Sequence, residues 1–188
     1  MKLHLRGATL SLLTLAVASI APLSAGSIVN NGGFETGDFT GWTQIGNTSF
    51  DGVTCPGLGA VPEGSCEAFF GPVGSDGGIQ QTLATTSGLQ YLITFQFEPD
   101  GGTPSDFSAT FDGSSLVSLT NPASSGFQFF SFIRTATSNS TVLAFNFRDD
   151  PGFLNLDAVT ASSVPEPVSA ALLGIGLGTL ALARRRRA

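Results

Sequence analysis

The central part of the sequence is poor in the side chains that usually carry enzyme chemistry. Residues 27–163 contain no lysine and no histidine, because Lys2 and His4, each the only residue of its type, lie near the N-terminus. A serine nucleophile usually needs one of these side chains to accept its proton, so their absence argues against serine hydrolase chemistry here. No segment of this region has an amphipathic helical pattern, which argues against a helical bundle.

Positive charge is equally scarce. Only Arg134 and Arg148 of the 8 Lys and Arg residues fall within residues 27–163, whereas all of the 14 acids except Glu166 do. This region therefore has 13 acids, 2 arginines and a net charge near −11. Such a surface repels phosphate backbones, so we expect no nucleic-acid partner. It would instead accept hard cations such as Ca²⁺.

The N-terminus has the layout of a secretory signal peptide. A basic start with Lys2 and Arg6 is followed by an apolar run and then by the small residues Ser-Ala-Gly. We predict a helical signal peptide over residues 1–25, cleaved after Ala25, that directs the chain to the Sec export machinery. The alternative is a buried N-terminal helix of the folded domain, which would show more polar residues along one face.

The only cysteines are Cys55 and Cys66, which flank the glycine- and proline-rich segment PGLGAVPEGS. An even number of cysteines in an exported chain indicates a disulfide. Closing a loop of this size stabilises the fold by about 3 kcal/mol. A zinc site is disfavoured, because two cysteines without a histidine do not complete the tetrahedral ligand set.

Five segments alternate in polarity with the period of two that is typical of half-buried strands. They are LQYLITFQFEP (89–99), DFSATFDG (106–113), FQFFSFIRT (127–135), TVLAFNFRD (141–149) and FLNLDAVTA (153–161). Segment 127–135 is partly apolar on both faces, which predicts a central strand or one covered on both sides. In the last segment, Val159 should face away from Leu154 and Leu156.

Turn-forming residues separate these segments, and no helical pattern intervenes. This arrangement predicts an all-β fold, an antiparallel β-sandwich or jelly roll of about nine strands over residues 27–160. Residues 161–167 are small, polar and proline-bearing, which is typical of a linker. Many of the acids lie in the turns, and we interpret them as solvated; they are Asp100, Asp106, Asp112, Asp149 and Asp150.

The first strand region begins with the segment NGGFETGDFTGW at residues 31–42. We interpret Phe34, Phe39 and Trp42 as core anchors, because a lone tryptophan beside a strand is more often buried than presented to a ligand. The alternative for Trp42 is a platform on which a sugar ring stacks. Tyr91, on the apolar face of its strand, carries the same two interpretations.

This opening segment and the closing FLNLDAV at 153–159 resemble the two ends of galactose-binding-like jelly rolls, a fold that includes many carbohydrate-binding modules. The resemblance implies a structural Ca²⁺ held by an acid after the first strand and an acid on the last. The matching residues here are Glu35 and Asp157. The alternative is a capped turn at Glu35 and a solvent-facing acid at Asp157.

The C-terminal tail has a different composition. Residues 168–183 form an uncharged apolar run, followed by a cluster at 184–188 that contains Arg184, Arg185, Arg186 and Arg187. A helix over this run would span about 24 Å, slightly less than a bilayer core, and the arginines would lie in the cytoplasm. We therefore expect a transmembrane helix with the domain outside. The alternative is a soluble amphipathic tail.

Just before this run stand Val164, Pro165, Glu166 and Pro167. Together with the apolar run and the arginines, they resemble the PEP-CTERM protein-sorting signal. The resemblance implies a temporary membrane anchor, recognition by an exosortase that cuts near Pro165–Pro167, and release to the cell surface or extracellular matrix. The prolines keep the chain extended at this point, which suits a processing enzyme.

These features together predict an exported, non-catalytic surface or matrix protein that binds or organises exopolysaccharide. One alternative is a purely structural or adhesive matrix protein without a small ligand. A second is a carbohydrate-active hydrolase or lyase that uses two of the acids as a carboxylate pair.

Overall fold

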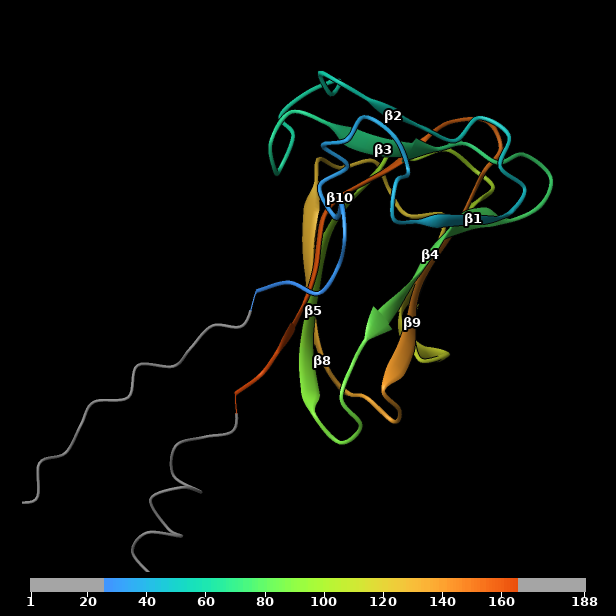
Figure 1. Ribbon diagram of the computed structural model, residues 1–188. Coiled ribbons are helices and arrows are strands. Elements are labelled where there is room, and N and C mark those ends of the chain that lie inside the picture. The colour runs from blue at the N-terminus through green and yellow to red at the C-terminus, as the bar shows by residue number, and fades with distance from the viewer. Residues whose placement is uncertain (1–25, 166–188) are drawn as a thin grey trace, which may run out of the picture. The chain divides into compact units, whose positions relative to one another are not determined.

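The computed structural model describes residues 26–165, which form two antiparallel sheets packed face to face (Figure 1). The strands are β1 (Thr43–Gly46), β2 (Gly52–Thr54), β3 (Glu67–Phe70), β4 (Gly77–Ala84), β5 (Gln90–Pro99), β6 (Ser105–Phe111), β7 (Ser114–Thr120), β8 (Gln128–Thr135), β9 (Ser140–Asp149) and β10 (Leu154–Ser163). Sheet A has the order β1-β4-β9-β6-β7, and sheet B has the order β2-β3-β10-β5-β8. The predicted all-β antiparallel sandwich is confirmed, with ten strands where about nine were expected.

Phenylalanine fills the space between the sheets. Phe97 of β5 stacks on Phe107 of β6 with ring centroids 3.9 Å apart, and Phe70 of β3 stacks on Phe147 of β9 at 3.8 Å. Each pair joins sheet B to sheet A, and all four side chains are buried. The period-two pattern correctly predicted the inward faces of β5 and β6.

The prediction for segment 127–135 is wrong. Its strand, β8, lies at the edge of sheet B and pairs only with β5. One face packs Phe130 and Phe132 against the core, but Phe129 and Ile133 on the other face are 66% and 51% exposed. The second apolar face is therefore part of the molecular surface.

The last strand departs from strict alternation. Ala158 has a left-handed φ of 53°, and the register of β10 with β5 shifts between Asp157 and Thr160, which marks a β-bulge. The bulge returns Val159 to the core side, where Leu154 and Leu156 also lie, so its predicted outward position is wrong. The strand also continues to Ser163, past the expected boundary at residue 160.

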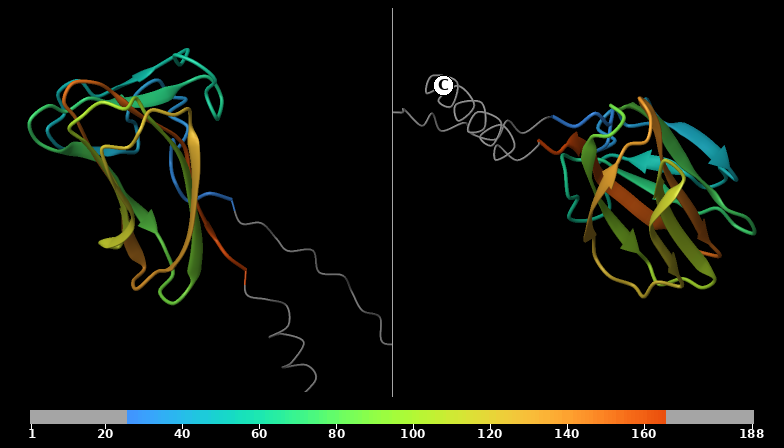
Figure 2. Two further views of the ribbon diagram at one scale, coloured as in Figure 1. Left: turned by 180° about the vertical axis from the view of Figure 1, so that it is seen from behind. Right: turned by 90° about the horizontal axis from the view of Figure 1, so that it is seen from below.

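The two ends of the described segment lie side by side. The amide of Ile28 donates a hydrogen bond to the carbonyl of Ala161, at 2.8 Å. Both views in Figure 2 show the blue start and the orange-red end leaving the domain together. No helix within residues 26–165 has the length and apolar character needed to span a membrane. The predicted helices over residues 1–25 and 168–183 fall outside the described residues.

Candidate functional site

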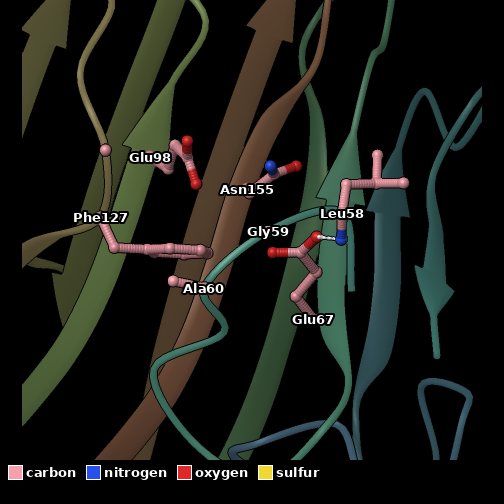
Figure 3. A pocket seen from close by; sticks show the side chains of 8 residues that line it. Leu58, Gly59, Ala60, Glu67, Glu98, Phe127 and Asn155 are labelled. Atoms are coloured by element: carbon pink, nitrogen blue, oxygen red, sulfur yellow. Dashed lines mark hydrogen bonds between the residues drawn. The ribbon is translucent and has the colours of Figure 1, made fainter. Parts of the chain in front are cut away.

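The outer face of sheet B carries a polar pocket of about 190 Å³. Three adjacent strands supply its floor, with Glu67 from β3, Asn155 from β10 and Glu98 from β5. The ring of Phe127, from the segment before β8, extends over the floor from one side, and Leu58 closes the other (Figure 3). The pocket thus combines hydrogen-bonding groups with an aromatic ring.

A second, more apolar pocket of about 390 Å³ adjoins the first, since both are lined by Leu58 and Asn155. Phe69 of β3 and Phe153, which precedes β10, line it, with ring centroids 5.5 Å apart in an edge-to-face arrangement. We call the two pockets together the sheet B groove. Neighbouring aromatic rings and polar side chains along a groove are suited to an elongated, hydroxyl-rich ligand.

The loop between β2 and β3 forms one wall of this groove. The predicted disulfide between Cys55 and Cys66 is present and closes the loop. The carboxylate of Glu67, which is buried, accepts a hydrogen bond from the amide of Leu58 at 2.7 Å. The disulfide and this bond together hold Leu58 over the sheet.

The groove is acidic, and its acids influence each other. Burial and the charge of Glu67 raise the pKa of Glu98, while a contact with the Asn155 side chain opposes the shift. No arginine lines either pocket. A neutral, hydroxyl-bearing ligand fits these groups better than an anionic one, because carboxylates accept hydrogen bonds from hydroxyls and repel anions.

Neither aromatic residue considered from the sequence as a sugar platform is available for that role. Trp42 is buried, lies 6.0 Å from Phe34 between ring centroids, and donates its indole N–H to the carbonyl of Asn31. Tyr91 is also buried, and its hydroxyl accepts a hydrogen bond from the amide of Thr86. Both are core residues, which was the interpretation preferred from the sequence over a sugar-stacking role.

Glu35 and Asp157 both accept hydrogen bonds from backbone amides of segment 63–66. Glu35 accepts hydrogen bonds from the amides of Ser65 and Cys66, each at 2.8 Å, and these bonds lower its pKa. Asp157 accepts one from the amide of Glu63 at 3.0 Å. Asp157 is fully buried, so the alternative of a solvent-facing acid is wrong.

Burial raises the pKa of Asp157 to about 6. Hydrogen bonds from backbone amides oppose this shift, whereas the nearby charges of Glu63 and Glu35 add to it. Glu63 is a third acid at this place that sequence reasoning did not include. Across residues 26–165, however, no three His, Cys, Asp or Glu side chains converge in the geometry of a metal site. A cation here would need backbone or water oxygens as well.

One acid interpreted as solvated is not. Asp149, the last residue of β9, is fully buried, and neither carboxylate oxygen has a hydrogen-bond partner. Its neighbour Asp150 does have partners, because it pairs with Arg148 and accepts a hydrogen bond from the amide of Gly74. Nothing in the local sequence distinguishes Asp149 from Asp150 in this respect.

Only Val164 and Pro165 of the predicted sorting signal fall within the described residues. The amide of Val164 donates to the carbonyl of Gln90 at 2.8 Å, and Pro165 is exposed. Glu166, Pro167 and the four arginines at 184–187 lie outside the described residues, so the sorting prediction stays a prediction.

No protein-family model and no curated protein matches the chain. Several solved structures share its fold. TmCBM61, solved in complex with beta-1,4-galactotriose, matches 73% of this chain and 99% of its own at a TM-score of 0.59 and 14% identity. The CBM22-1 xylan-binding domain from Paenibacillus barcinonensis Xyn10C matches 80% of this chain and 100% of its own at a TM-score of 0.50 and 16% identity.

The enzymatically active domain of bacteriophage CBA120 tailspike protein 4 also matches, with a TM-score of 0.57 and 17% identity. The match covers 73% of this chain but only 21% of the tailspike chain. At these identities the likeness shows the fold alone. The domain therefore shares the β-sandwich fold of these solved structures.

Proposed function

We propose that the domain is a non-catalytic module that binds a neutral polysaccharide in the sheet B groove. The observation that carries this proposal is the row of Glu98, Asn155 and Phe69 across the outer face of sheet B, with Phe127 at one end and Glu67 beside Phe69 on β3. Aromatic rings stack on the apolar faces of sugars, and carboxylate and amide groups bind their hydroxyls. The carbohydrate-binding modules with this fold support the same ligand class.

The test is affinity electrophoresis of the full chain through gels that contain neutral polysaccharides, including a beta-1,4-galactan and a xylan. Retardation by at least one polysaccharide is expected, with Phe127→Ala abolishing most of it. Thr82→Ala on the outer face of sheet A is the matched control and should migrate as the wild type. No retardation in any gel would leave the structural or adhesive alternative.

The same samples separate binding from catalysis. Glu67 and Glu98 line one pocket, as the two carboxylates of a glycoside hydrolase would. Glu67, however, is buried and its carboxylate holds the amide of Leu58, which is a positioning role. We expect no release of reducing ends on prolonged incubation. Release that is lost in Glu98→Gln would establish a hydrolase instead.

We further propose that Glu35 and Asp157 hold a structural Ca²⁺ beside Glu63, with backbone and water oxygens as the remaining ligands. Carboxylate oxygens suit this ion, and the only charges that act on buried Asp157 are those of the other two acids. The ion would neutralise these charges and fasten the last strand to segment 63–66. Removing Ca²⁺ with a chelator should lower the unfolding midpoint of the wild type, and Asp157→Asn should reduce that shift.

Export and sorting complete the proposal. The signal-peptide pattern over residues 1–25 and the Pro-Glu-Pro, apolar and arginine tail support transient membrane anchoring, cutting by an exosortase and release to the surface or matrix, where exopolysaccharide is the expected partner. Mass spectrometry of the protein from the cell surface tests this directly. A terminus near Pro165–Pro167 is expected, and an intact terminus at Ala188 would overturn the sorting proposal.

A further inference from the structure

Two carboxylates from different sheets meet at one end of the sandwich. Asp149 ends β9 in sheet A, and Asp100 directly follows β5 in sheet B. The two side chains are in contact, and this contact, after burial, raises the pKa of Asp149 to about 7. Like charges repel at such short range, so something has to stabilise the pair when both carboxylates are ionised.

Asp149 differs from Asp100 because its oxygens have no hydrogen-bond partner. The carboxylate of Asp100 accepts hydrogen bonds from the amides of Gly102, at 2.6 Å, and Phe153, at 3.1 Å. Asp149 is fully buried, and neither of its oxygens has a hydrogen-bond partner. A buried carboxylate without a partner is costly, and such a group in a folded protein calls for an explanation.

The surrounding chain leaves room for these oxygens and adds another. A Cβ placed on Gly102 would touch Oδ1 of Asp149 and would lie 3.1 Å from both Oδ1 of Asp100 and the carbonyl oxygen of Pro151. A Cβ on Gly152 would touch Oδ2 of Asp100 and would lie 2.8 Å from Oδ2 of Asp149. Oxygens from three residues therefore converge, and two glycines make the convergence possible.

No basic side chain among residues 26–165 neutralises this pair. The arginines of residues 26–165 are Arg134 and Arg148. Arg148 is bound to Asp150, and Arg134 lies over the ring of Phe132, 5.8 Å from its centroid. The charges that act on Asp149 come from Asp100 and Asp150, both negative. The missing positive charge has to come from outside residues 26–165 or from a proton.

We propose that Asp100, Asp149 and the carbonyl of Pro151 form a binding site for a hard divalent cation of the Ca²⁺ type, with water as the remaining ligands. Each carboxylate oxygen has two lone pairs, so Asp100 keeps acceptor capacity beside its two backbone bonds. The cation ties the end of sheet A to the end of sheet B. This site uses loops different from those of Glu35, Glu63 and Asp157, and it does not depend on the polysaccharide proposal.

The competing explanation is a proton shared between Asp149 and Asp100. The two explanations differ in a measurement at pH 8 on the full chain, first stripped of metals with a chelator and then titrated with CaCl₂ alone. Calorimetry gives the number of Ca²⁺ bound, and thermal unfolding gives the midpoint Tm. The variants are Asp149→Asn, which removes the buried charge, and Asp150→Asn, which removes an equal charge one residue away.

A cation site predicts that Asp149→Asn binds one Ca²⁺ fewer than the wild type, while Asp150→Asn keeps the wild-type number. Without Ca²⁺, Asp149→Asn should melt at or above the wild-type Tm, because no unpaired charge remains buried. Saturating Ca²⁺ should raise the wild-type Tm by roughly 3–10 °C and the variant's by less, so that the order of the two midpoints reverses.

An equal Ca²⁺ number in wild type and Asp149→Asn would overturn the proposal and leave the shared proton. If Asp149→Asn does not fold, Asp100→Asn gives the same readout, since it removes the other carboxylate. It should weaken Ca²⁺ binding at this site at least tenfold, and unchanged binding would again overturn the proposal.

Discussion

On the outer face of sheet B, Phe129 is 66% exposed and Phe69 lines an open pocket, whereas the outer face of sheet A presents Gln80, Ser108 and Asn146. The aromatic residues in the strands of sheet A are Phe107, Phe111, Phe145 and Phe147, and all of them are buried. Both sheets present phenylalanine to the core, and they differ on the side that faces solvent.

This difference separates two uses of the same residue type. A buried phenylalanine contributes to stability through the area it removes from water, but an exposed one contributes little. Exposed aromatic side chains gathered on one face of a sandwich therefore point to a ligand rather than to folding.

Removing a buried aromatic side chain should give the largest effect. Phe107→Ala deletes the ring that stacks on Phe97 across the core and should reduce the free energy of unfolding by about 3–5 kcal/mol, measured in urea. Phe129→Ala is the matched change on the outer face of sheet B. If the two variants lost similar stability, the division between core and solvent-exposed aromatic side chains would be wrong.

The next effect concerns Asp51, before β2. Burial raises the pKa of Asp51 to about 6. The nearby amide of Gly71 opposes this shift, although it forms no hydrogen bond with the carboxylate. Because the folded pKa is above the ordinary value of 3.8, this group lowers stability as the pH rises from about 4 through 6. Asp51→Asn should remove that loss and be more stable than the wild type by about 1–3 kcal/mol at pH 8.

Urea unfolding of both proteins at pH 4 and pH 8, with a chelator present, checks this prediction. The variant and the wild type should differ little at pH 4, where Asp51 is protonated in the folded state. A difference that does not grow with pH would show that Asp51 is hydrated rather than buried when ionised.

A smaller effect, on polysaccharide binding, should distinguish two asparagines that each line a pocket on the outer face of a sheet. Asn155 lines both pockets of the sheet B groove, and Asn146 lines a polar hollow of about 210 Å³ over sheet A with Asp76 and Asp106. Asn155→Ala should weaken polysaccharide binding about tenfold, or about 1.4 kcal/mol, by removing hydrogen bonds to the ligand. Asn146→Ala should leave it unchanged, and an equal loss in both variants would remove the preference for sheet B.

The smallest effect is expected for Ile133→Ser on β8. This side chain is 51% exposed and faces away from the core, so the change in unfolding free energy should stay within about 0.5 kcal/mol. A larger loss in urea unfolding would mean that another part of the chain covers this face.

The period-two pattern predicted the buried faces of β5 and β6, since Ile93, Phe95 and Phe107 are buried as expected. It could not predict β8 as an edge strand, because the same pattern arises from a covered apolar face and from a solvent-exposed one. It also failed in β10, where a bulge at Ala158 adds one residue that local polarity does not reveal.

The site was harder to predict than the fold. Glu67, Glu98 and Asn155 are far apart in sequence and meet only because β3, β10 and β5 are neighbours in sheet B, an order that no local signal contains. Glu35 and Asp157 could be named because a resemblance linked the two ends of the domain. Asp149 could not be distinguished from Asp150, since burial of one and pairing of the other depend on the loops around them.

The hydrogen bond between Ile28 and Ala161 makes the domain nearly a closed ring of chain. A short glycine-rich link between these ends, with new termini opened in an exposed turn such as that at Gly113, should give a circular permutant with the same groove. The domain could likewise be inserted into a surface loop of another protein without separating the loop's ends. The domain can therefore be joined to another protein through both of its ends at one place on its surface.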